Sequence, residues 1–171
     1  MKKVFLSLFL ILSISLGCLA QKVAYVDSHY ILDNIPAYHS AQEQLNKASK
    51  AYQEELEKIH AEIEKMEGDL KTEAILLTPD MIKRRKDVII TKRKEYENLQ
   101  KKYFGRDGSI FKKRKSLIKP IQDDIFNALQ RIAEEGSYAI IMDKALQGNI
   151  IFSDPKYDLS DVVLERLGYK N

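Results

Sequence analysis

The chain has 171 residues, 44% of them hydrophobic and 31% charged, with a net charge of +3, one cysteine and no tryptophan. A single cysteine excludes an intrachain disulfide framework. Few glycines and many charges are typical of long exposed helices rather than of a compact enzyme.

Residues 1–20 have the pattern of a secretory signal peptide, because two lysines precede an apolar run that ends in small residues. Cys18 and Ala20 fit a small-x-small cleavage pattern, which places the mature N-terminus at Gln21. Two alternatives stay open: a lipidated Cys18, as in lipoproteins, and a membrane span over 4–16, which is shorter than the roughly 20 residues that a span needs. Export predicts a periplasmic location.

A β-prone run, KVAYVD, covers residues 22–27. From residue 41 the apolar positions are spaced by three and four, which predicts a coiled-coil helix over 41–74. Its stripe comprises Ala41, Leu45, Ala48, Tyr52, Leu56, Ile59, Ile63, Met66 and Leu70. The helix is expected to end near 76–79, where Thr78 suits an N-cap and Pro79 the first position of a second helix.

The second helix is predicted over 79–119, with an apolar residue at every seventh position from Ile82 to Leu117. We therefore expect residues 41–119 to form an antiparallel helical hairpin, a coiled-coil arm with its tip near 75–81. Gly105 and Gly108 would weaken the returning helix locally and let the arm bend.

The C-terminal part restores an apolar helix face after Pro120, a further kink candidate, and then has β-prone runs at 138–142 and 150–152. These runs and 22–27 predict a sheet of about three short strands, made from both ends of the mature chain. Asp158 is expected to cap a last helix that Gly168 ends. The predicted fold class is mainly α with a small β body, and this body comprises residues 21–40 and 120–171.

So small a body offers a poor core, and its exposed strand edges invite pairing. A closed homo-oligomer in which subunits share one sheet or barrel would remove these edges. The candidate residues of this oligomerisation body are Ala24, Val26, Ile140, Ile141 and Ile151.

Charge is distributed unevenly along the predicted hairpin. Residues 83–119 contain fifteen Lys or Arg and four Asp or Glu, whereas 41–74 contain five and nine. Arg85 and Lys92 stand at seam-like positions, where they would loosen the contact between the helices; the alternative is a solvated face that pairs with glutamates of the other helix. An apolar cluster lies at the tip, where it either caps the coiled coil or contacts a client or a membrane. The candidate client-binding residues are Leu76, Leu77, Met81, Arg85 and Lys92.

Motifs of catalysis are missing from the sequence: it has no P-loop, dinucleotide-binding glycine pattern, nucleophile elbow or Cys-x-x-Cys. The spacing of His29, His39 and His60 matches no metal motif. We therefore predict that the protein is not an enzyme and has no metal site or cofactor. An exported protein rarely meets nucleic acid, so no physiological nucleic-acid partner is expected.

The order of these segments resembles the Skp/OmpH family of periplasmic chaperones. The resemblance covers residues 22–168, and its specific parts are KVAYVDSHYIL, YFGRDGSIFKKRKSLIKPIQDDIFNAL, GSYAIIMDK and FSDPKYDLSDVVLERL. It implies a jellyfish-like homotrimer, with a β-rich body from both ends of each chain and helical arms around a cavity. It also implies ATP-independent holding of unfolded outer-membrane β-barrel proteins.

Without residues 1–20 the chain has 26 basic and 25 acidic residues, so at most a weak contact with membrane or lipopolysaccharide is expected. The leading hypothesis is a holdase that retains clients through many weak contacts. The alternative is a structural coiled-coil envelope protein, lipid-anchored if Cys18 is acylated. The interrupted, half-basic seam favours the chaperone, because a spacer would repeat its apolar positions more strictly.

Overall fold

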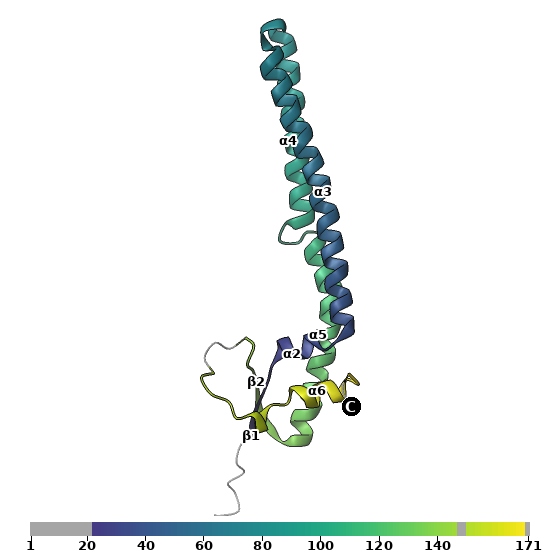
Figure 1. Ribbon diagram of the computed structural model, residues 1–171, viewed down its shortest axis with the longest axis vertical. Coiled ribbons are helices and arrows are strands. Elements are labelled where there is room, and N and C mark those ends of the chain that lie inside the picture. Colours follow the sequence, from purple (N-terminus) through teal and green to yellow (C-terminus); the bar gives the residue numbers. More distant parts are fainter. Residues whose placement is uncertain (1–21, 147–149, 170–171) are drawn as a thin grey trace, which may run out of the picture. The chain divides into compact units, whose positions relative to one another are not determined.

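The computed structural model describes residues 22–146 and 150–169, so the expected signal peptide and Cys18 lie outside the described residues. The chain is mostly helical with one small sheet, as Figure 1 shows. The described residues form two compact units. One, the hairpin unit, covers 35–123; the other, the body unit, combines 22–34 with residues from 124 onwards.

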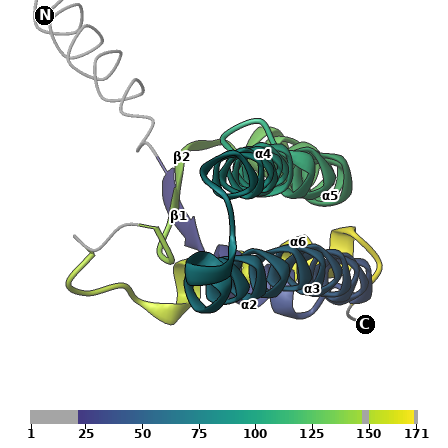
Figure 2. The same ribbon diagram turned by 90° about the horizontal axis from the view of Figure 1, so that it is seen from above.

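Two long helices dominate the hairpin unit: α3 (Pro36–Glu73) and α4 (Pro79–Phe104). A 3-10 turn, η2 (Ala74–Leu76), joins them, and α4 runs back beside α3, as a view along the helices also shows (Figure 2). The predicted cap is confirmed: the Thr78 hydroxyl accepts a hydrogen bond from the Met81 N–H at 3.3 Å, and Pro79 begins α4. The chain reverses here because Pro79 cannot continue the preceding turn, whereas its fixed φ suits a helix start.

The predicted apolar stripe of α3 is confirmed, because all nine of its side chains are buried or half-buried. A buried cluster joins Ile59 and Ile63 of α3 to Ile89 of α4, with partly buried neighbours around it. Burial of these side chains, at roughly 25 cal/mol per Å², holds the two helices together.

The expectation of one helix over 79–119 is wrong. Helix α4 ends at Phe104, and four residues separate it from the start of α5 (Ser109–Gly136). The two glycines do more than weaken the helix, because neither position has room for a side chain. A Cβ on Gly105 would lie 2.3 Å from the Lys101 carbonyl oxygen, and one on Gly108 would lie 2.7 Å from that of Tyr103.

The body unit contains two parallel strands, β1 (Lys22–Val26) and β2 (Tyr138–Asp143), the part of α5 from residue 124 onwards, and three short helices. These helices are α2 (Ser28–Asp33), the 3-10 turn η3 (Pro155–Tyr157) and α6 (Ser160–Arg166). Helix α2 packs against α6. Ile31 of α2 and Val163 and Leu164 of α6 are fully buried side chains of the body unit.

The expectation of a strand at 150–152 is wrong, and among the described residues the sheet has two strands rather than three. The edge of β1 opposite β2 is occupied by another segment. Tyr25 bridges to Asp158, and the Leu159 N–H donates to the Tyr25 carbonyl oxygen at 2.9 Å. Residues 150–152 therefore do not pair with β1 at Tyr25, and they lie outside any helix or strand.

The last helix was expected to have Asp158 as its N-cap, but it begins one residue later, at Ser160. Leu159 occupies the N-cap, while the Asp158 carboxylate accepts a bond from the Ser160 N–H at 2.9 Å. The expected end at Gly168 is confirmed. This glycine has φ +80°, and the bonds Gly168 N–H to Glu165 O and Tyr169 N–H to Leu164 O form a Schellman motif.

Candidate functional site

Ion pairs across the hairpin fix the basic side chains of α4 to the acidic side chains of α3. Arg85 Nη1 lies 2.7 Å from Glu73 Oε2, and Lys92 Nζ lies 3.1 Å from Glu62 Oε2. The expectation that Arg85 and Lys92 loosen the helix contact is therefore wrong. The two side chains bridge the helices at the margin of the apolar stripe, as the alternative interpretation proposed.

Lys92 also contacts Glu95 on its own helix, at 3.2 Å. Its hydrogen bond to Glu62, followed by that to Glu95, raises the pKa of the Lys92 ammonium above its ordinary value. The charged form is thus favoured, and the cross-helix bridge is maintained at neutral pH. A lysine held in this way is less available to an anionic ligand than its position in the sequence suggests.

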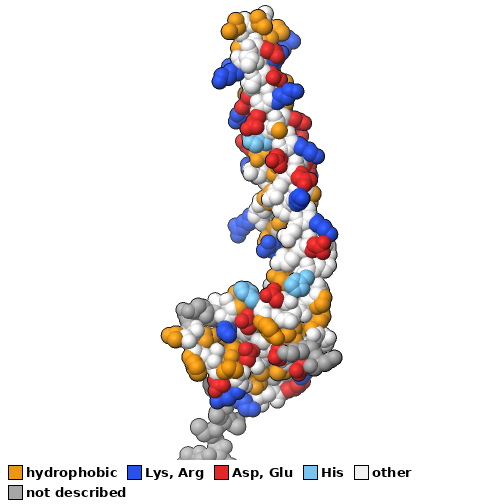
Figure 3. Space-filling model, in the orientation of Figure 1, with side chains coloured by type: hydrophobic (Ala, Val, Ile, Leu, Met, Phe, Trp, Pro, Cys, Tyr) orange, Lys and Arg blue, Asp and Glu red, His pale blue; other side chains and the backbone are white. Residues whose placement is uncertain are grey.

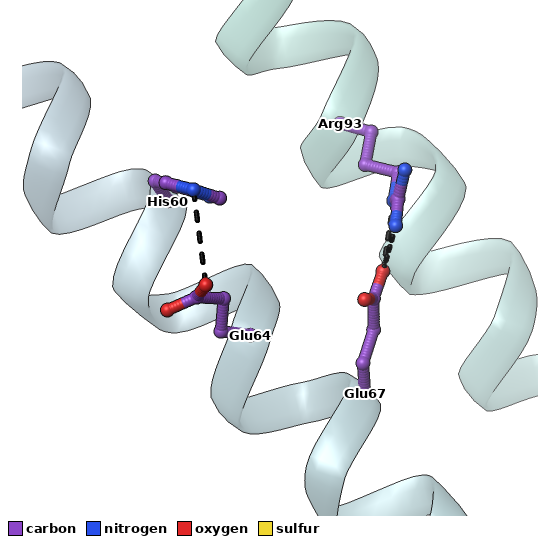
Figure 4. Close-up of polar contacts among 4 residues, drawn as sticks. All are labelled: His60, Glu64, Glu67 and Arg93. Atoms are coloured by element: carbon purple, nitrogen blue, oxygen red, sulfur yellow. Dashed lines mark hydrogen bonds and ion pairs between the residues drawn. The ribbon is translucent and has the colours of Figure 1, made fainter.

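A third bridge, between Arg93 and Glu67, escaped the sequence analysis (Figure 4). Arg93 Nε donates to Glu67 Oε1 at 2.8 Å, and Nη2 donates to the same oxygen. In the same view His60 stays on α3, with Nε2 3.8 Å from Glu64 Oε1. The signal that could have revealed these pairs is the excess of acid on 41–74 opposite the excess of base on 83–119.

The tip of the hairpin, residues 75–81, exposes large apolar side chains. Ile75 is 94% exposed, Leu76 84% and Met81 46%, whereas Leu77 is half-buried against the turn. Figure 3 shows hydrophobic side chains at this end of the hairpin with basic side chains beside them. Of the candidate client-binding residues, Leu76 and Met81 are therefore open to a partner, and Leu77 only partly so.

A groove of about 380 Å³ lies between α3 and α4 near the tip. Its apolar lining includes Met66, Val88 and Ile89, and its charged lining includes Glu73 and Arg85. Val88 is 56% exposed. The sequence did not predict this groove. The apolar face of the second helix was assigned from every seventh residue after Ile82, and Val88 is not one of these positions.

The candidate oligomerisation residues fall into two classes in the body unit. Ala24 and Val26 are buried within their own chain, so their side chains are not open to a partner. Ile140 and Ile151 are 54% and 99% exposed, and Ile141 is half-buried. The structure brings Ala24 and Ile141 together as directly paired residues of β1 and β2, but it places Ile151 outside the sheet.

A cleft of about 930 Å³ opens beside β1 in the same unit. Its lining includes four aromatic side chains, together with two lysines that lie over tyrosine rings. Lys156 Nζ is 4.8 Å from the centre of the Tyr157 ring, and Lys22 Nζ is 5.9 Å from that of Tyr138. Sequence analysis missed this aromatic surface, although Tyr138 and Phe152 stand in or beside the β-prone runs.

Among residues 22–146 and 150–169, no group of three or more His, Cys, Asp or Glu side chains could hold a metal ion. Within the same ranges, no helix has both the length and the hydrophobicity that a membrane span requires.

Comparison with known proteins places the chain in a family. The family model described as "Outer membrane protein (OmpH-like)" matches residues 22–167. No curated protein sequence matches this chain. Among solved structures, an OmpH-like protein of Caulobacter crescentus CB15 has the same fold, with a TM-score of 0.65 over 88% of this chain and 86% of that one, at 11% identity. The family match spans both the hairpin unit and the body unit, and the chain therefore belongs to the OmpH-like family of outer membrane proteins.

Proposed function

We propose that the protein is an ATP-independent holdase chaperone, which binds unfolded outer-membrane β-barrel proteins in the periplasm and prevents their aggregation. Membership in the OmpH-like family supports this function, as does the fold shared with a candidate outer membrane chaperone. The observation that carries the proposal is the number of large apolar side chains that the hairpin unit leaves exposed. They are Ile75, Leu76, Met81, Val88, Ile90, Phe104 and Phe111.

These side chains are dispersed along the hairpin rather than gathered in one pocket. An unfolded barrel protein offers many apolar segments, and many weak contacts of this kind retain it without a specific site. In this proposal Leu76, Leu77 and Met81 contact clients by apolar burial. Arg85 and Lys92 contribute through the charge pattern around the groove, as partners of Glu73 and Glu62.

The proposed assembly is a homotrimer in which both ends of each chain build a shared body and the hairpins are arms around a cavity. The body unit alone has a two-stranded sheet, with exposed apolar side chains that a single chain leaves uncovered. Exposed strand edges and apolar surface of this extent are typical of an interface. The chaperone needs no nucleotide, metal or cofactor, and no nucleic acid is its physiological partner.

Light scattering on the mature protein, alone and mixed with a urea-denatured β-barrel precursor, tests the proposal. We expect a trimer that forms a stoichiometric soluble complex with the precursor. A particle that leaves the precursor to aggregate would contradict the function. A matched control is a soluble unfolded protein of low hydrophobicity, which should remain unbound.

The alternative is a structural coiled-coil envelope protein, lipid-anchored through Cys18. One observation favours it: Arg85 and Lys92 tie the two helices together, so the hairpin is stiffer than an interrupted seam implies. Mass spectrometry of the mature N-terminus distinguishes part of the question, since an acylated Cys18 supports anchoring and an N-terminal Gln21 contradicts it.

A further inference from the structure

The cleft beside β1 leaves much of its apolar lining open to solvent. Val23 and Met142 are 41% and 40% exposed, and Phe152 is 84% exposed. The chain enters the body unit at Lys22, the first residue of β1, and Lys22 itself lines the cleft. We propose that, in the uncleaved chain, residues 4–16 fold back into this cleft and cover its apolar lining until the expected signal peptide is removed.

The proposed occupant is strongly apolar. Residues 4–16, called the apolar run below, lie outside the described residues and contain ten large apolar side chains, three serines and no charge. In water such a run is stabilised by any apolar surface that it can reach, because burial removes its side chains from the solvent. The cleft offers a surface of this kind where the chain enters the body unit.

A short connection keeps the apolar run close to the cleft. Residues 17–21 separate it from β1, so six Cα–Cα steps join Leu16 to Lys22 and extend over at most about 20 Å. A short flexible linker of this kind gives an effective concentration of the order of 1 mM. At lower chain concentrations the tethered run therefore has an advantage over a second copy of the chain, even if its own contacts are weak.

The charges of the lining suit an uncharged occupant. Lys22, Asp154 and Lys156 are the charged residues of the lining, and Asp154 Oδ2 pairs with Lys156 Nζ at 2.8 Å. Both lysines also lie over tyrosine rings, whose faces attract the ammonium groups. The net charge of the lining is thus only +1, which gives a strongly anionic partner little attraction. A neutral apolar run can enter without breaking these contacts.

The size of the cleft limits how much of the apolar run it can hold. Its volume of about 930 Å³ is at the upper end of the range of small-molecule sites, so several side chains fit but not the whole run. The exposed apolar surface that the run would cover belongs to the body unit, through which the subunits of the proposed trimer assemble. Docking of the run and assembly of the body should therefore exclude each other.

Cross-linking within the uncleaved chain tests this contact. Cys18 is the one cysteine of the sequence, so Cys18→Ser gives a background without thiols. Leu10→Cys, in the middle of the apolar run, is then combined with Ser153→Cys in the cleft lining. A short bismaleimide, added to the refolded chain at low concentration, should join the two cysteines within one chain. Denaturing gels and mass spectrometry distinguish this product from a cross-linked dimer.

A matched pair and a charged run locate the contact. Leu10→Cys with Asn127→Cys, at an exposed residue of α5 outside the cleft lining, should give about tenfold less product, because the tether is the same and only docking differs. Leu8→Asp and Leu12→Asp, added to the Ser153 pair, should also lower the yield about tenfold, since burial of a charge is costly.

Sedimentation shows whether docking delays assembly, a consequence that rests on the proposed trimer. We expect the mature chain to be a trimer, the uncleaved chain to be a monomer at the same concentration, and the uncleaved chain with Leu8→Asp and Leu12→Asp to be a trimer again. A monomeric mature chain would contradict the trimer, whereas the cross-linking yields would still decide whether the apolar run docks.

The proposal is overturned if the Ser153 and Asn127 pairs cross-link equally, because the apolar run then has no preferred place. It is also overturned if the product is a dimer, because a second copy then occupies the cleft, or if the charged run cross-links as well as the unchanged one. No client is present in these experiments, so their outcome and that of the holdase test are independent.

Discussion

The rings of Tyr52 on α3 and Tyr103 at the end of α4 stack face to face, with centres 4.0 Å apart and planes 5° from parallel. The Tyr103 hydroxyl donates a hydrogen bond to Glu55 Oε2 at 2.8 Å, and Phe104 meets the Tyr52 ring edge-on. These contacts lie directly before the interruption between α4 and α5, so they hold the end of α4 where the helix itself stops.

The hydrogen bond to Glu55, followed by burial, raises the pKa of the Tyr103 phenol above its ordinary value of 10.0. The neutral phenol is the stabilised form, so this contribution is present below pH 10.0 and is lost as the pH rises through the folded pKa. We expect ultraviolet titration to show one tyrosine that ionises late, absent in Tyr103→Phe and shifted down in Glu55→Gln. An unchanged titration in Glu55→Gln would contradict the assignment.

Arg85 and Glu73 provide a test of whether the basic seam residues serve structure or clients. Arg85→Glu and Glu73→Arg should each destabilise the hairpin, and the double variant should recover stability, with a coupling energy of about 0.5 kcal/mol for so exposed a pair. Urea denaturation measures it. If the double variant retains clients as the wild type does, the role of Arg85 is structural; if retention is lost while stability is restored, the side chain contacts clients.

The glycines of the interruption should tolerate no side chain. Gly105→Ala is expected to destabilise the hairpin unit by about 1–3 kcal/mol, because the new Cβ meets the Lys101 carbonyl oxygen and the backbone must move. Gly68→Ala is the matched control. No atom lies within 4 Å of its Cβ, so the change in the interior of α3 should stabilise by about 1 kcal/mol. Equal effects of the two substitutions would contradict this interpretation.

Acid should weaken the body unit through Glu135. Its carboxylate accepts a bond from Arg166 Nη1 at 2.7 Å, and this bond holds the pKa of Glu135 below the ordinary 4.5. The stabilisation is therefore present above pH 4.5 and is lost as the pH falls through the lower folded value. Thermal unfolding of wild type and Glu135→Gln should differ at neutral pH and converge in acid. A gap that stays constant across this range would rule out the ion pair as its source.

Assembly through the body unit can be separated from its folding. In the proposed trimer, Ile141→Lys should release monomers that unfold, because the strand surface would lose its apolar contact with neighbouring subunits. Ile140→Lys is a second variant at a more exposed site and should dissociate the oligomer with a smaller effect on folding. Ile31→Ala, in the core of one chain, should cost about 2–5 kcal/mol without changing subunit number. Sedimentation measures the subunit number. A folded, soluble monomer of the wild-type chain would contradict a shared body.

The sequence specified the elements whose signals are local. The stripe from Ala41 to Leu70, the cap at Thr78 and the stop at Gly168 depend on spacing or on one residue's backbone preference, and the structure confirms all three. Residues 150–152 were wrongly predicted as a strand. β-propensity measures only how well side chains suit a pleated surface, and it does not show whether a neighbouring strand is available for pairing. Whether a place beside β1 is free depends on Asp158 and Leu159, which local patterns do not reveal.

The site was less predictable than the fold for a related reason. Arg85 and Lys92 break the apolar seam of α4, but their role follows from which glutamates of α3 stand opposite, and this register is a property of two helices together. Exposure at Ile75 and Leu76 could be anticipated from an apolar run in a turn. The exposure of Val88 and Ile90 could not, since a single helix does not define which of its faces the partner covers.

The sheet of the body unit joins parts of the chain that are made at very different times. Lys22 donates to the Gly136 carbonyl, 114 positions away, and the Asp27 N–H donates to Ser160, 133 positions away. The contacts of the hairpin are far more local and so should form first, while loop closure delays distant pairs. A chain still emerging can thus complete the hairpin while β1 waits with both edges open. During synthesis this short strand therefore stays without its partner until the C-terminal part of the chain has been made.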